Sequence, residues 1–173
     1  ETISVTSGDV IYVGVGEEGW PTMNSGSDPT RYTIRVYTLE DAMQNLPAAS
    51  SVTLNNYGAY DETVQKMEDL ISQQGWSGDR SQLDALKERV AFYAEIVNVK
   101  NLLNKVPAAD QLDRGDIDAV EAAHEAYEDL SEEQRLYITL SDVAKYNAAV
   151  EWLEKQGVHT PGSIAGNENP PEE

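Results

Sequence analysis

One uninterrupted stretch limits the folds open to this chain more than any other feature. It runs from Ser81 to Val106, contains no glycine or proline, and spaces its apolar residues as a helix does. Ser81 followed by Asp84 predicts its start, and Pro107 predicts its end. Such a helix would span roughly 39 Å, so it needs apolar partners along both halves. Its predicted buried stripe is Leu83, Leu86, Val90, Tyr93, Val97 and Leu103.

The composition excludes several classes of protein. The chain has 173 residues, 40% of them hydrophobic, which suffices for one or two domains with a core. Its net charge of −19 disfavours nucleic acid and anionic membranes as partners. It has no cysteine, so disulfides and thiolate chemistry are excluded. No apolar run reaches the ~18 residues of a membrane span, and no signal peptide precedes the first predicted strand. Because the chain begins with Glu1, we expect a processed or excised piece of a longer protein.

Residues 1–37 alternate with a period of two. This pattern predicts three strands, before and after a Gly8-Asp9 turn and again at Arg31 to Tyr37. Gly16 to Thr30 is a loop by composition. Three strands leave sheet edges open, so either the helices cover them or upstream strands belong to the same sheet.

From Thr38 onward the period is helical. Thr38 with Asp41 predicts a short helix to Leu46, and a second helix is predicted from Tyr57 to Gln74. After the long helix, three more segments are predicted. They are a helix from Asp116 to Leu130, a short segment from Glu132 to Thr139 opened by a Ser131/Gln134 capping box, and a last helix opened by Ser141 or Asp142 and ended at Gly157.

The helical part repeats itself at an offset of 60 residues. Pro47-Ala48-Ala49 matches Pro107-Ala108-Ala109, and Glu68-Asp69-Leu70 matches Glu128-Asp129-Leu130. The same offset joins Ser81 to Ser141, Val90 to Val150 and Phe92 to Trp152. The repeat predicts two tandem copies, in which the long helix is the third helix of the first copy fused to the first helix of the second.

These observations predict an α+β chain. A short antiparallel, sandwich-like β segment at 1–37, complete or incomplete, is followed by two tandem three-helix units at 38–97 and 98–156 that share one long continuous helix. Residues 157–173 have the composition of a linker or tail.

The N-terminal residues resemble the closing strands of cadherin-like β-sandwich domains of bacterial surface proteins. The resemblance rests on Gly8-Asp9-Val10-Ile11-Tyr12-Val13-Gly14-Val15 and Tyr32-Thr33-Ile34-Arg35-Val36. The loop from Glu17 to Pro29 is longer than the usual one.

The second helical copy is similar to a tandem helical repeat of large surface proteins from Gram-positive bacteria. The first copy departs from the pattern at Gly75 to Arg80. The resemblance implies an extracellular, non-catalytic spacer or interaction module. The residues that carry it are Val106-Pro107-Ala108-Ala109, Asp116-Ile117-Asp118-Ala119-Val120-Glu121-Ala122-Ala123, Ala126-Tyr127-Glu128-Asp129-Leu130-Ser131-Glu132-Glu133-Gln134, Val143 and Ala148-Ala149-Val150.

Few residues suggest catalysis or metal binding. His124 falls on the apolar stripe, where a histidine capped by a carboxylate is the favoured interpretation, and His159 lies in the predicted linker. Paired acids such as Glu68-Asp69 diverge on a helix and are interpreted as a solvated face. Four aspartates suggest either helix capping, which we favour, or a calcium site whose spacing is not that of an EF-hand: Asp110, Asp113, Asp116 and Asp118.

Two tryptophans lie in polar loops. Trp20 and Trp76 could each stack on a sugar or anchor a protein partner, or could fold back to cover an open edge of the structure. They are the candidate ligand-binding residues.

The leading hypothesis is therefore a non-catalytic spacer or interaction module of an extracellular bacterial surface protein. The alternative is an adhesion module that binds a glycan or a protein through the loop tryptophans. A third hypothesis, an enzyme or accessory domain, would require a concave pocket with convergent titratable groups. We expect no catalytic residue, no metal and no cofactor, no nucleic-acid partner, no membrane insertion of this stretch, and a monomer.

Overall fold

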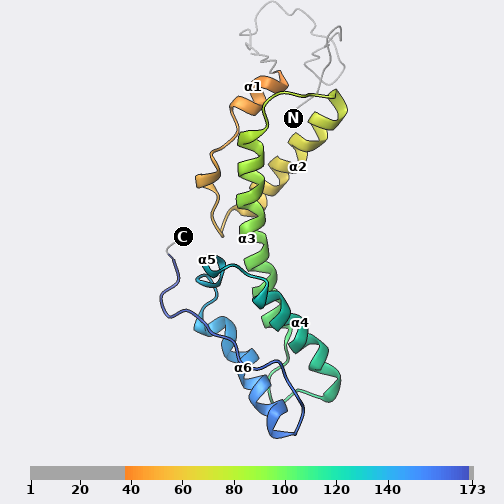
Figure 1. The fold of residues 1–173 in the computed structure, drawn as a ribbon, viewed down its shortest axis with the longest axis vertical. Helices are drawn as coiled ribbons and strands as arrows, with labels where there is room; N and C mark the ends of the chain where they lie inside the picture. The colour runs from red at the N-terminus through yellow and green to blue at the C-terminus, as the bar shows by residue number, and fades with distance from the viewer. Residues whose placement is uncertain (1–37, 172–173) are drawn as a thin grey trace, which may run out of the picture. The chain divides into compact units, whose positions relative to one another are not determined.

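The computed structural model describes residues 38–171, and these form a helical structure (Figure 1). Two short 3-10 turns, η1 and η2, interrupt the connections. In chain order the elements are α1 (Leu39–Gln44), η1 (Ala49–Ser51), α2 (Tyr57–Gln74), α3 (Ser81–Lys105), η2 (Arg114–Asp116), α4 (Ile117–Glu128), α5 (Glu132–Arg135) and α6 (Leu140–Lys155).

The predicted α+β class is wrong. Within residues 38–171 there is no β-strand, only one isolated parallel bridge between Thr139 and Asn167. This part of the chain has helical apolar periods with helix caps, and such a pattern favours helices over a sheet. The three predicted strands, and the residues that resemble a cadherin-like domain, lie outside the described residues.

The central element is α3, the predicted long helix, which ends one residue earlier than expected. It contacts α1, α2 and η1 on one side of its midpoint and α4, α5 and α6 on the other (Figure 1). Its buried residues lie along its whole length: Leu83, Leu86, Val90, Tyr93, Ile96, Val99 and Leu103. Val97, predicted in the stripe, is only half-buried.

Local sequence signals set most helix ends. The Thr38/Asp41 and Ser131/Gln134 capping boxes are both present, as predicted. Two predicted caps are wrong. Thr139 rather than Ser141 caps α6, with Asp142 closing the box. The carboxylate of Asp79, not the Ser81 side chain, accepts the first free N–H of α3.

Burial along the chain recurs at the spacing of 60 residues found in the sequence. The pairs with both members buried are Leu39/Val99, Met43/Leu103, Leu46/Val106, Val52/Leu112, Met67/Tyr127, Leu83/Val143, Leu86/Tyr146, Val90/Val150 and Tyr93/Leu153. The second half of α3 therefore occupies in the second copy the positions that α1 occupies in the first. The exact domain boundaries remain predictions.

The residues after α6 lie along the helices, although their composition is typical of a linker. We call Val158 to Asn167 the strap. Thr160 and Ile164 in the strap are buried. The Tyr127 hydroxyl donates to the Ala165 carbonyl at 2.8 Å, and the Asn167 N–H donates to the Ile138 carbonyl at 2.7 Å.

Replacing a buried leucine of α3 is expected to destabilise the whole described part. Leu103 is 0% exposed, so Leu103→Ala should lower the free energy of unfolding by about 3 kcal/mol through lost burial and a cavity. Leu136→Ala is the matched control, because Leu136 is 48% exposed and its loss should cost under about 1 kcal/mol. Urea unfolding followed by circular dichroism measures both. Equal losses for the two variants would contradict this packing.

Candidate functional site

The loop between α2 and α3 holds Trp76, the one predicted ligand-binding residue within the described part of the chain. Gly75 ends α2 with a φ of +62°, a left-handed conformation that glycine adopts without strain. The Trp76 indole is half-buried and packs against the hydrophobic core. A Cβ at Gly78 would lie 2.2 Å from an indole carbon, so this ring position requires glycine there. Trp76 thus folds back onto its own loop.

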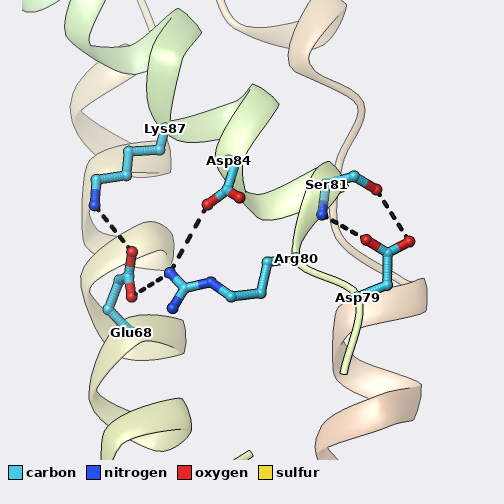
Figure 2. A network of polar contacts seen from close by, with 6 residues as sticks. All are labelled: Glu68, Asp79, Arg80, Ser81, Asp84 and Lys87. Carbon is cyan, nitrogen blue, oxygen red and sulfur yellow. Dashed lines mark hydrogen bonds and ion pairs between the residues drawn. The ribbon is translucent and has the colours of Figure 1, made fainter. Parts of the chain in front are cut away.

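Ion pairs hold this loop against the start of α3 (Figure 2). The Glu68 carboxylate accepts from Arg80 Nη2 at 2.6 Å and from Lys87 Nζ at 2.9 Å. Arg80 also lies 3.8 Å from Asp84. The Glu68 carboxylate on α2 therefore binds one cation from the loop, Arg80, and one from α3, Lys87.

The electrostatics of the corner, by which we mean the loop between α2 and α3 and the residues paired to it, favour ionised carboxylates. Hydrogen bonds from Lys87 and then Arg80 lower the pKa of Glu68. Asp79 accepts from the Ser81 N–H at 2.9 Å and from the Ser81 hydroxyl at 3.1 Å, and these bonds lower the pKa of Asp79. Neither acid is placed to act as a proton donor near neutral pH.

A pocket of about 330 Å³ lies beside this loop. Among its described lining residues, the Trp76 side chain lies with carboxylate, amide and hydroxyl groups, and none is a histidine, lysine or arginine. An aromatic surface surrounded by polar groups can hold a neutral, hydroxyl-rich molecule better than an anion. The lining residues are Glu40, Met43, Gln44, Trp76, Gly78, Asp79, Ser81 and Gln82.

Trp20, the second predicted ligand-binding residue, lies outside the described residues.

His124 is half-buried, as expected for a boundary residue, but its predicted carboxylate partner is wrong. Its Nδ1 lies 3.2 Å from the hydroxyl of Tyr146, which itself donates to the Gly162 carbonyl at 2.9 Å. The single phenol proton of Tyr146 is donated to the Gly162 carbonyl, so in the contact with His124 the Nδ1–H donates and the Tyr146 oxygen accepts. Burial raises the pKa of Tyr146 to about 12, so the phenol stays protonated.

The aspartates that suggested calcium include a capping pair. The Gly115 N–H donates to Asp113 at 2.6 Å, and the Asp113 N–H donates to Asp116 at 2.9 Å. In residues 38–171, no three acidic or histidine side chains come together in a way that would hold a metal ion. The capping interpretation thus accounts for Asp113 and Asp116.

Sequence reasoning missed the ion pairs around Glu68, although the repeat contained a signal for them. The carboxylate of the equivalent Glu128 lies 3.4 Å from Nη2 of Arg135, and the main-chain carbonyl of Glu128 accepts from the same nitrogen at 2.6 Å. In both copies a basic residue beyond the end of the helix returns to the repeated glutamate. The repeated glutamates are therefore anchoring groups, rather than only part of the solvated face that was predicted.

The chain matches no family model, and neither the curated proteins nor the solved structures include a match to it. Among the described helices, none combines the length and the hydropathy that a membrane crossing requires.

The Glu68 pairs predict a pH-dependent contribution to stability. The folded-state pKa of Glu68 lies below its ordinary 4.5, so this stabilisation is complete above about pH 4.5 and is lost as the pH falls through the lower folded value. Glu68→Gln should cost about 1 kcal/mol at pH 7, and the cost should shrink toward pH 3. Glu62→Gln is the control, since that side chain is 76% exposed. A Glu68→Gln cost that does not change between pH 7 and pH 3 in urea titrations would contradict the assignment.

Proposed function

We propose that this chain is a non-catalytic spacer and interaction module of an extracellular bacterial surface protein. The observation that carries the proposal is the continuity of α3, a helix of 25 residues covered by other helices on both halves. At ~1.5 Å per residue, it keeps its two ends about 37 Å apart. Packing along the whole length stabilises this helix, because most helical stability in proteins comes from tertiary packing. The surface location rests on the resemblance of the second copy to bacterial surface repeats.

Charge supports a spacing role. The net charge of −19 keeps copies of the chain apart and opposes collapse onto anionic surfaces. Each helical copy alone would bury few apolar residues, so the shared helix joins their stability as neighbouring units are joined in repeat proteins.

The second candidate function is binding of a glycan at the Trp76 pocket, and one observation favours it. The indole forms part of the wall of a 330 Å³ pocket together with Asp79, Gln44 and Gln82. A sugar ring can stack its C–H face on an indole while its hydroxyl groups bond to amides and carboxylates. Within the described lining no cation faces an acidic ligand, so a neutral sugar is the class that these residues fit.

The spacer function predicts a single, narrow distance along α3. The chain has no native cysteine, so spin labels can be attached at Glu88→Cys and Lys105→Cys, both on exposed positions. A straight helix places these Cα atoms about 26 Å apart. Pulsed electron resonance should give one peak consistent with that separation. A broad or bimodal distribution would contradict a stiff spacer.

The glycan function predicts that a hit on an array of neutral oligosaccharides depends on the loop tryptophan. Trp76→Ala should reduce binding at least about tenfold, the effect expected for one stacked aromatic ring. Trp76→Phe should keep most of the binding, because it retains a flat apolar face. Trp20→Ala separates the contribution of the other predicted residue. Absence of any glycan hit, or binding unchanged by Trp76→Ala, would reject this function for the pocket.

A further inference from the structure

The strap docks on a groove that recognises an extended peptide, and we propose that the strap of one copy can occupy the groove of a second copy of this chain. We define the strap groove by the residues upstream of the strap that hydrogen-bond to its stretch 162–167: Tyr127, Leu136, Ile138, Leu140, Tyr146 and Asn147. The inference goes beyond a spacer role, because it gives the chain a specific way to join to itself.

Recognition in the groove is largely through the main chain of the strap. The Asn147 side chain accepts from the Ile164 N–H and donates to the Ile164 carbonyl, each at 2.9 Å. Tyr146 and Tyr127 donate to the carbonyls of Gly162 and Ala165. These contacts read an extended backbone and not the identity of most strap side chains, as in proteins that bind peptides by strand addition.

The far end of the strap pairs with backbone in the same manner. The Asn167 N–H donates to the Ile138 carbonyl at 2.7 Å, and the Leu140 N–H donates to the Asn167 carbonyl at 3.3 Å. This is the only β-bridge within residues 38–171. An identical segment from another copy could make the same bonds.

Two side-chain positions in the strap give the groove its specificity. Ile164 is 7% exposed and is the apolar anchor. Gly166 leaves no room for a side chain, because a Cβ there would lie 2.6 Å from the Thr139 carbonyl oxygen and 2.7 Å from the Leu140 nitrogen. The groove thus selects a buried aliphatic residue followed two positions later by glycine.

The strap is free of the charge that keeps copies apart. Between Val158 and Asn167 there is no aspartate, glutamate, lysine or arginine, although a quarter of the whole chain is charged. The groove residues are also uncharged, and the charged hydrogen-bond partner of the strap is Glu154, which accepts from the Thr160 hydroxyl at 3.1 Å. Because the strap itself carries no acid, its exchange brings no like charges together at the contact.

The connection to α6 allows an exchange. Gly157 lies just after the helix with a φ of +74° and open space around it, and Gly162 has a φ of +99°. The seven residue steps from Gly157 to Ile164 reach roughly 24 Å when extended. Exchange of identical segments costs little free energy, because the same contacts form in both states. At low protein concentration, the strap of the same chain occupies the groove in preference to the strap of a second copy, since its effective concentration is on the order of millimolar.

The test uses two full-length variants that complement each other. Gly166→Val has a strap that cannot dock and an intact groove, whereas Asn147→Ala has an intact strap and a damaged groove. Mixed at ~1 mM, which is comparable to the effective concentration of a tethered strap, they should form a heterodimer by native mass spectrometry, about tenfold more than either variant forms alone. Ser163→Val is the matched control for Gly166→Val, because Ser163 is exposed in the strap. Its own strap stays docked, so its mixture with Asn147→Ala should give no such excess.

Amide hydrogen exchange decides the meaning of a negative result. If the amides of Ile164 and Asn167 exchange rapidly in Gly166→Val, the groove is empty, and absence of the heterodimer then overturns the proposal. If that variant loses its helical circular dichroism, Ile164→Ala replaces it as the milder release of the strap, and the same two outcomes are scored. An equal excess with Ser163→Val also overturns the proposal, because the dimer would then not depend on the strap.

Discussion

Burial of α3 on both halves is the constraint on which the rest of the described structure depends. A helix of 25 residues offers more apolar surface than either group of neighbours can cover, and its residues Leu83 and Leu103, near opposite ends, are both 0% exposed. The first group, α1, α2 and η1, covers one half of α3, and the second group, α4, α5 and α6, covers the other half. Both groups pack on the shared helix, so the loss of α3 would expose both cores at once.

In the two copies, different residues hold the corner that follows α2 in the first copy and α4 in the second. In the first, the Trp76 indole lies on Gly78 and the Glu68 ion pairs hold the loop. In the second, α5 takes the place of the loop, and the buried Gln134 side chain donates to the Phe92 carbonyl at 3.1 Å and to Glu95 at 2.6 Å. The second corner is thus attached to the middle of α3, and the pocket of about 220 Å³ beside it has no aromatic residue among its described lining residues, whereas Trp76 lines the pocket of the first corner. This difference is why a binding role is proposed only for the Trp76 corner.

Helices were predictable where a period and a cap agree. The bounds of α2 follow from an apolar stripe between Tyr57 and Gly75, and the Ser131/Gln134 box located α5. Contacts between distant residues were not predictable in this way. The strap has no period, because its backbone and not its side chains is recognised, and Gly166 shows its role only once the Thr139 carbonyl lies beside it. The pairing of Arg80 with Glu68 likewise depends on how α2 and α3 cross. The α+β class failed because it was assigned from residues 1–37 alone.

Residue-resolved hydrogen exchange of the α3 amides tests the shared helix most directly. If one helix supports both groups, the amides from Leu86 to Leu103 should exchange with a single free energy of opening, equal to that of global unfolding. Two blocks that open separately, divided near Glu95 and differing by more than about 2 kcal/mol, would contradict a single cooperative helix.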